Sequence, residues 1–277
     1  MSTATFPELY RRYMAAFGTP DLPEIAAVGV KFVKHGDAAP PQAAPLDMAY
    51  TWCYALKQAA KGEVPLVTKE TIGCMMAGIA LGLIDEQDPD PLPGWRQYSQ
   101  NMGTPPTPRD YREGLVFGCA AAGRQDLALY GADDVGRYLS VDAAKKAYQG
   151  MPKVQPATTA AVVAFPPDPE LATIEPDVVI LALTPRETLR TIQGLTFQTG
   201  ERFESSTLGV GGFSVDLTSY PYVTGKPNAS FLCVGARVVA RWEGGLNGLG
   251  LPWSYFQSAV AGMEASATGY PFPRYPG

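Results

Sequence analysis

Two short apolar runs constrain the fold of this chain more than any other feature of its sequence. Residues 160–165 and residues 178–183 are nearly all apolar, and a strand of that composition has to be covered on both of its faces. Both runs therefore predict strands at the centre of a sheet. Because the other strand and helix patterns do not alternate regularly, the sequence favours an α+β fold, with helices packed on a mixed sheet.

The chain of 277 residues is close to the size at which one hydrophobic core stops growing. Hydrophobic residues make up 46% of it and charged residues 18%, a balance that predicts a globular protein rather than a disordered one. We interpret residues 1–277 as a single domain. Residues 85–110 are rich in proline and predict a surface insertion, and residues 270–277 predict an extended tail of prolines and aromatic residues.

Hydrophobic periodicity predicts the remaining elements. Helices are expected at residues 6–17, 116–122, 141–148, 185–200 and 253–265, strands at 28–33 and 237–242, and a glycine-rich turn before the last helix. Asp47 is expected to cap a further helix that carries Cys53. Another helix is expected to begin either at Thr68 or at Gly73, with Cys74 near its start. Only the second start places the Cys74 thiol in the first turn, where free backbone N–H groups favour the thiolate.

Charge and composition argue against several classes of partner and chemistry. The 22 basic and 27 acidic side chains leave a net charge of −5, which gives no general attraction to nucleic acid or to an anionic membrane. No basic segment followed by an apolar one opens the chain, and the longest apolar run, 73–84, is about half of the roughly 20 residues that a spanning helix needs. We therefore expect a soluble cytoplasmic protein with reduced cysteines. His35 is the only histidine in the chain, and this excludes most catalytic triads because they require a histidine.

Cys53, Cys74 and Cys233 are the candidate ligands of a metal site. Thiolates bind zinc and iron–sulfur clusters without histidine, so three converging cysteines would form a soft-metal or iron–sulfur centre. No two of them form a CxxC pair, the compact spacing typical of such sites. The alternative is that each cysteine fills a gap in the core as a small apolar side chain. Among cofactors, the sequence points only to a thiolate-bound metal or an iron–sulfur cluster.

Hydroxyl groups and glycines in the segment 205–212 predict a binding site for a small anionic molecule. Glycines allow a ligand to approach the backbone closely, as in anion-binding nests, but the segment fits neither a P-loop nor a GxGxxG motif. The predicted substrate-binding residues are Ser205, Ser206, Gly211, Gly212, Lys31 and Arg237. Arg237 would clamp a carboxylate or phosphate group with its planar guanidinium. The alternatives are a glycine bulge or tight turn and ordinary surface cations.

Asp216 and Tyr222 follow the glycine segment and are the candidates for proton transfer. Together with Cys74 as a reactive thiol, either would complete a catalytic set as proton donor or acceptor. Aromatic residues flank the same motifs, which suits a planar organic ligand. The alternatives are that Asp216 stabilises a turn and that Tyr222 packs in the core.

Five blocks of sequence carry a resemblance to a known family. They are CYALKQAAKG from residue 53, the segment 68–83 around Cys74, PDVVIL from residue 176, GVGG from residue 209 with PYVTGKPN from residue 221, and CVGAR from residue 233. In this order, and over most of the chain, they resemble the bacterial and archaeal family known as domain of unknown function 169. The resemblance implies a cytoplasmic prokaryotic protein and no established activity.

The resemblance also bears on the cysteines. Members of the family tend to carry cysteines at positions that match these three, and often another where this chain has Ser214. A four-thiolate site of that kind would keep three clear ligands here, with Cys119 as a fourth only if the fold brings it close. The insertion at 85–110 and the region after residue 241 match the family pattern poorly, so no substrate contact is carried over from them.

These patterns predict a cytoplasmic small-molecule enzyme, a thiol-based or metal-assisted lyase acting on an anionic, planar metabolite. Hydride transfer is disfavoured because no dinucleotide fingerprint is visible. The alternative is a non-catalytic protein that binds a metal, an iron–sulfur cluster or a metabolite at the same place. A third hypothesis is a structural subunit, a homo-oligomer assembled through the aromatic tail. None of the patterns identifies the substrate.

Overall fold

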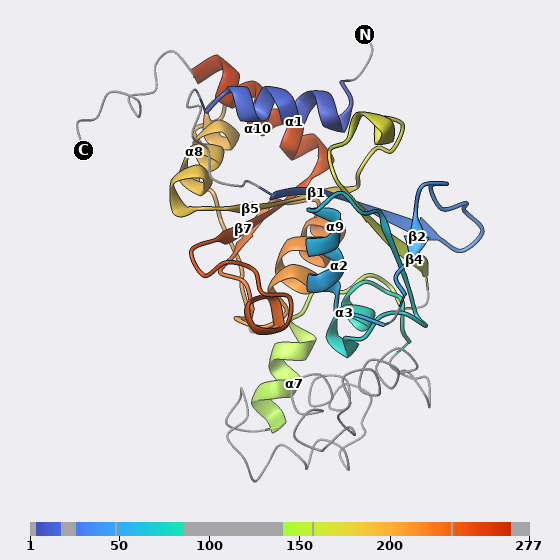
Figure 1. Ribbon diagram of the computed structural model, residues 1–277. Helices are drawn as coiled ribbons and strands as arrows, with labels where there is room; N and C mark the ends of the chain where they lie inside the picture. The colour runs from blue at the N-terminus through green and yellow to red at the C-terminus, as the bar shows by residue number, and fades with distance from the viewer. Residues whose placement is uncertain are drawn as a thin grey trace.

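A seven-stranded mixed sheet runs through the middle of the molecule, with helices on both of its faces (Figure 1). The computed structural model describes residues 4–17, 26–47, 49–85, 141–156, 158–233 and 235–266. The described strands lie in the order β2-β3-β4-β1-β5-β7-β6, and among them only β2 and β3 pair in parallel. Their bounds are β1 Ala26–Lys34, β2 Ala44–Pro45, β3 Pro65–Thr68, β4 Thr159–Phe165, β5 Val178–Leu183, β6 Asn228–Ser230 and β7 Asn247–Pro252. The predicted α+β fold is confirmed.

The two apolar runs form β4 and β5, which flank β1 at the centre of the sheet, as the sequence predicts. Side chains alternate between two cores, as the pleat of a strand requires. In β5, Val178 and Ile180 belong to the core on one face, and Val179 and Leu181 belong to the core on the other. Burial of both faces therefore makes a helical layer necessary on each side.

The layer on one face consists of α1 Phe6–Ala15, α8 Pro185–Thr196 and α10 Trp253–Ser266 (Figure 1). A short 3₁₀ turn, η2 Pro169–Leu171, follows β4. Phe6 of α1 packs edge-on against Phe165 at a centroid distance of 5.8 Å and against Phe256 at 5.9 Å. Thr5 and Thr184 begin α1 and α8 with capping boxes, each closed by a glutamate three residues later. The three helices predicted here are confirmed.

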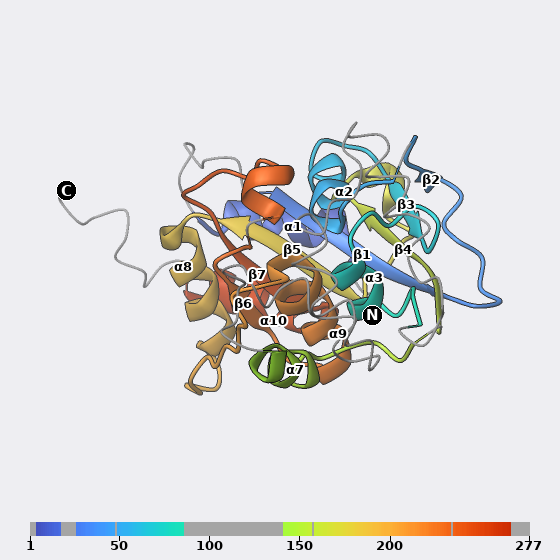
Figure 2. The same ribbon diagram turned by 90° about the horizontal axis from the view of Figure 1, so that it is seen from below.

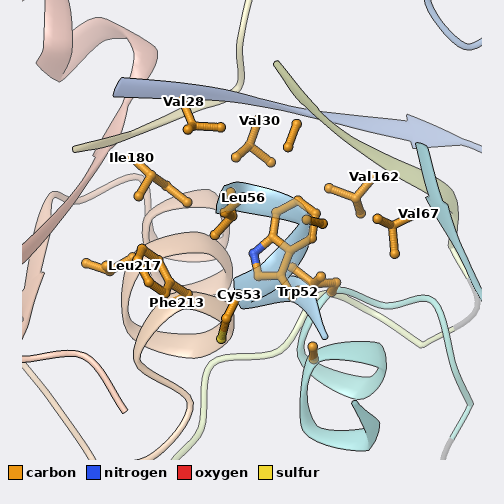
Figure 3. Packing of buried hydrophobic residues seen from close by; sticks show 14 of the residues in the cluster. Val28, Val30, Trp52, Cys53, Leu56, Val67, Val162, Ile180, Phe213 and Leu217 are labelled. Atoms are coloured by element: carbon orange, nitrogen blue, oxygen red, sulfur yellow. The ribbon is translucent and has the colours of Figure 1, made fainter. Parts of the chain in front are cut away.

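The layer on the other face is less regular. It holds α2 Trp52–Ala59, α3 Met75–Ala80, α9 Tyr220–Thr224 and two π-helices, η3 Gly212–Ser219 and η4 Gly235–Val239. Figure 2 shows α2, α3 and α9 in front of the sheet when the molecule is seen from below. The helix α7 Val141–Gln149, also predicted, lies beyond this layer (Figure 1). Trp52 and Leu56 of α2 and Phe213 and Leu217 of η3 line the core beneath the central strands (Figure 3).

The starts of two helices differ from the prediction. The α2 helix begins at Trp52, capped by Thr51, whose Oγ1 accepts a hydrogen bond from Tyr54 N at 3.3 Å. Capping by Asp47 is wrong because Tyr50 forms an isolated bridge with Ile72 and holds the chain extended. The α3 helix begins with Cys74 as its N-cap residue, which agrees with the later of the two predicted starts.

The predicted strand at 237–242 is wrong. Residues 235–239 form η4, and the strand lies instead in the expected glycine-rich turn, as β7. Several predictions lie outside the described residues: the helix at 116–122, Cys119, the tail at 270–277 and the insertion from residue 86 onward.

Within the ranges that the structure describes, no helix is long and apolar enough to cross a membrane.

The glycines of β7 allow η3 to lie directly on the sheet. A Cβ atom at Gly250 would be 2.7 Å from Leu217 Cα and 2.8 Å from Leu217 C, and it would also meet the Leu217 carbonyl oxygen. Atoms of the main chain cannot move aside cheaply. We therefore expect Gly250→Ala to lower the free energy of unfolding by about 1–3 kcal/mol, measured by urea unfolding. Gly244→Ala is the matched control, because a Cβ there meets nothing within 4 Å. Equal stabilities for the two variants would contradict this arrangement.

Candidate functional site

Cys53 and Cys233 meet in the helical layer that contains the π-helices. Cys53 lies on α2, and Cys233 lies just before η4. A Cβ atom built on Gly235 would be 3.8 Å from Cys233 Sγ and 4.0 Å from Cys53 Sγ, so both sulfurs border one glycine. The two thiols are hydrogen-bonded to each other. Figure 3 shows the Cys53 sulfur pointing away from the sheet.

The environment of Cys53 sets the character of this thiol pair. The hydrogen bond to Cys233 and, after it, burial raise the pKa of Cys53 well above its usual range. Cys74 raises the same pKa electrostatically, so the third thiol lies in the same neighbourhood. Cys53 and Cys233 are buried, whereas Cys74 is half-buried. Cys53 is therefore protonated at neutral pH, and Cys74 is the more accessible thiol.

The three cysteines were predicted as ligands of a metal site. No group of three or more His, Cys, Asp or Glu side chains within the described ranges is placed to hold a metal ion. Structural zinc and iron–sulfur sites generally use four ligands, and here two thiols touch while a third lies nearby. Ser214 is buried on η3, where its Oγ lies 3.5 Å from the Gly211 carbonyl oxygen. Metal binding by Cys53, Cys74 and Cys233 stays a prediction.

The backbone around Cys233 is unusual. Leu232 and Arg241 have φ angles of 65° and 54°, and they flank the segment that contains η4. A left-handed conformation in a residue other than glycine costs on the order of 1–3 kcal/mol, and such residues cluster at functional sites. π-Helices are rare and also occur often at functional sites. Local geometry therefore marks the layer around Cys233 as the candidate site.

The predicted glycine segment lies against this cysteine. Gly211 has a φ of 67°, and a Cβ atom there would be 2.7 Å from Met76 Sδ. A Cβ atom on Gly212 would be 2.9 Å from Cys233 N. Only glycine fits where the segment is confined between α3 and the Cys233 backbone. Local packing thus accounts for both glycines, Gly211 as the left-handed N-cap of η3 and Gly212 as its first residue, and ligand binding by them stays a prediction.

Asp216 is a buried carboxyl group with three hydrogen-bond donors. Its Oδ2 accepts hydrogen bonds from Thr207 Oγ1 at 2.7 Å and Ser230 Oγ at 2.9 Å, and the carboxylate also accepts one from Leu208 N–H. Burial raises the pKa of Asp216 to about 6, although the hydrogen bonds act to lower it, and Cys233 contributes a further small rise. A carboxyl group that changes charge near neutral pH suits proton transfer.

Asn228 holds the predicted serines in place. Its Nδ2 donates to Asp216 O at 2.9 Å and to Ser206 O at 2.8 Å, and its Oδ1 accepts from Ser206 N at 2.8 Å. Ser205 Oγ donates to Ala229 O at 2.9 Å. Both serines therefore join the segment to β6, and ligand binding by them stays a prediction. Asn228 ends the PYVTGKPN block, but no sequence pattern predicts this role for it.

The two predicted cations have structural partners. Lys31 Nζ lies 2.8 Å from Asp177 Oδ1 in a half-buried ion pair. Arg237 closes the loop that contains η4 by donating to four backbone carbonyl oxygens, those of Phe231, Glu243, Gly244 and Leu246. Both positive charges thus take part in contacts within the fold, and substrate binding by Lys31 and by Arg237 stays a prediction.

Tyr222 lies over β1, within reach of the Lys31–Asp177 pair. Its ring stacks on Phe32 at a centroid distance of 3.9 Å. Burial first, and the charge of Asp177 second, raise the pKa of Tyr222. The core-packing alternative describes this ring, and none of its described contacts joins it to the thiols.

A third apolar cluster lies between α3, α7 and the glycine segment. Its buried members are Met76, Ile79, Ala80, Tyr148, Met151, Val210 and Val215, and Cys74 packs against it. The phenolic oxygen of Tyr148 is buried and has no hydrogen-bond partner among the described residues. Lys153 Nζ lies 3.6 Å from the centre of the Tyr148 ring. No sequence motif contains Tyr148 or Lys153, so no pattern predicts their arrangement.

Comparison with known proteins places the chain in an uncharacterised family. The model of the domain of unknown function 169 (DUF169) family, described as uncharacterised ArCR, matches residues 23–262, and the chain belongs to this family. An uncharacterised protein of Methanocaldococcus jannaschii is 30% identical over 106 residues, which are 38% of this chain and 44% of that protein. The chain thus spans less than half the length of this curated relative. No solved structure matches.

The pKa of Asp216 predicts how stability depends on pH. Because burial raises this pKa from 3.8 to about 6, the folded chain binds the proton more tightly than the unfolded chain does. The stabilisation is complete below pH 4 and is lost as pH rises to about 6. The Asp216→Asn side chain does not titrate, so the variant does not lose this stabilisation as the pH rises. From pH 4 to pH 7, the free energy of unfolding of Asp216→Asn relative to that of the wild type should therefore rise by about 3 kcal/mol.

Urea unfolding at pH 4, 5, 6 and 7 measures this difference. Asp37→Asn is the control, because Asp37 is an exposed carboxyl group on a turn. If the gap in stability between Asp216→Asn and the wild type does not change with pH, the assigned state of Asp216 is incorrect.

Proposed function

We propose that this protein is a cysteine-dependent, cytoplasmic small-molecule enzyme whose reactive centre comprises Cys53, Cys74, Cys233 and Asp216. The observation that carries the proposal is the contact between Cys53 and Cys233, which come from distant parts of the chain. The strained backbone at Leu232 supports it, because strain of this kind persists where a function requires it.

The three thiols have different roles in this proposal. Cys74 is the reactive thiol, because it is half-buried while the others are buried. Cys53 is protonated and donates its hydrogen bond to Cys233, which fixes the inner pair. A reducing compartment keeps all three as thiols.

Asp216 moves the proton. The reaction class proposed is a thiol-based lyase. The Cys74 thiolate displaces a leaving group from a substrate carbon, forming a carbon–sulfur bond, and protonated Asp216 gives its proton to the departing group. The Asp216 carboxylate then takes a proton from the adjacent carbon as the carbon–sulfur bond breaks, which forms the carbon–carbon double bond and restores the thiolate and the protonated Asp216. The pKa of Asp216, at about 6, allows it to act in both directions near neutral pH.

Alkylation of the folded protein tests the role of Cys74. With limiting iodoacetamide and peptide mass spectrometry, we expect Cys74 to be modified at least about tenfold faster than Cys53 or Cys233, because alkylation needs an accessible thiolate. In urea the three rates should converge. Cys74→Ser should abolish the fast reaction, and Cys233→Ser should preserve it. Equal rates for Cys74 and Cys53 in the folded protein would refute this assignment.

A second candidate function is the binding of a soft metal or an iron–sulfur cluster, with or without catalysis. The same convergence of Cys53 and Cys233, with Cys74 electrostatically coupled to them, favours it. Anaerobic purification followed by metal analysis and an ultraviolet–visible spectrum separates the candidates. A stoichiometric metal that is lost in Cys53→Ser and in Cys233→Ser supports the binding function. Metal-free protein with a fast-reacting Cys74 supports the thiol enzyme.

A further inference from the structure

The hydroxyl group of Tyr148 is buried without a hydrogen-bond partner among the described residues, which lowers the stability of the fold. A buried hydroxyl without a partner destabilises a protein by about 1–3 kcal/mol, and each such group in a native protein calls for an explanation. Tyr148 is 2% exposed, and its oxygen has no partner in the part of the chain that the structure describes. Tyr13 provides the contrast, because its buried hydroxyl hydrogen-bonds to Thr191 Oγ1 at 2.6 Å.

The position of Tyr148 connects it to the candidate site. Tyr148 belongs to the cluster against which Cys74 packs. The segment after α7 is held rigidly, because Val154 N donates to Ala80 O at 3.0 Å and Ser219 Oγ donates to Pro152 O at 2.7 Å. These bonds join it to α3 and to η3. Tyr148 is therefore held in place within the cluster against which the accessible thiol packs.

A positive charge accompanies this donor. The Lys153 ammonium lies over the ring that carries the phenol, with Nζ 3.6 Å from the ring centre. A ring face attracts a cation and holds it in place. The described residues of the cluster are apolar, so an anion there would experience little competing solvent. The Tyr148 O–H and the Lys153 ammonium group above the same ring could both donate hydrogen bonds to one carboxylate.

We propose that Tyr148 is a substrate-binding residue whose O–H donates a hydrogen bond to a small carboxylate-bearing molecule beside Cys74, with Lys153 supplying the charge. This inference rests on the proposed function, in which Cys74 is the reactive thiol. It gives the anion-recognition role to residues other than Lys31 and Arg237.

Stability measurements test whether the phenol lacks a partner. Tyr148→Phe removes an unpaired hydroxyl, so its Tm should equal or exceed that of the wild type. Tyr13→Phe removes a paired hydroxyl, so its Tm should fall by about 2 °C or more. If Tyr148→Phe lowers the Tm as much as Tyr13→Phe does, the phenol has a partner within the protein and the proposal fails.

Alkylation with two reagents tests recognition of the anion. Iodoacetate carries a carboxylate and iodoacetamide does not, so the ratio of their rates at Cys74 reports binding of the carboxylate. We expect Tyr148→Phe and Lys153→Gln each to lower this ratio about fivefold to tenfold, with the iodoacetamide rate unchanged. Lys146→Gln, which removes an exposed charge from α7, should leave the ratio as it is in the wild type.

The outcomes separate the two proposals. If neither reagent modifies Cys74, the proposed function fails. If both reagents modify Cys74 but the ratio is the same in the wild type, Tyr148→Phe and Lys153→Gln, only the role of Tyr148 fails. A ratio that falls equally in Lys146→Gln would show a general charge effect, and this result also overturns the role of Tyr148.

Discussion

The close approach of η3 to β7 is the constraint on which the rest of the structure depends. Gly248 and Gly250 remove the side chains that would hold these elements apart, and Leu217 fills the space. The π-helix can therefore lie on the sheet. As a result Asp216 is buried among hydroxyl donors, and Gly212, the first residue of η3, lies against the Cys233 backbone. A regular helix on a strand with ordinary side chains would lie further out. The thiol contact is thus a consequence of backbone packing.

How far the sequence predicts the fold depends on whether its signals are local. The continuous apolar runs of β4 and β5 have one interpretation, and the caps of α1 and α8 are readable from neighbouring residues. The strand β7 was missed because its glycines resemble a turn, whereas they serve contact with Leu217. The family resemblance indicated which cysteines are candidate site residues. It could not predict that two of them are in contact, because that contact depends on the tertiary structure. The loop-closing contacts of Arg237 could not be predicted for the same reason, since its four carbonyl partners carry no sequence signal.

The candidate site combines features that a purely structural layer does not require. Leu232 has an unfavourable left-handed backbone conformation beside Cys233. The buried carboxyl group of Asp216 has a pKa of about 6, and the buried hydroxyl of Tyr148 has no hydrogen-bond partner among the described residues. Each lowers stability, and natural sequences retain such costs mainly where function needs them. Together with the half-buried Cys74, these features support the proposed thiol-dependent function. Membership of an uncharacterised family adds no chemistry of its own.

The contact between Cys53 and Cys233 is tested most directly by oxidation with diamide. In Cys74→Ser the reagent accepts two electrons and two protons from a pair of thiols, forming a disulfide only where the sulfurs can touch. Peptide mapping should identify Cys53–Cys233 as the bond formed. A bond from either residue to Cys119, or no bond in a folded protein that diamide demonstrably enters, would contradict the account.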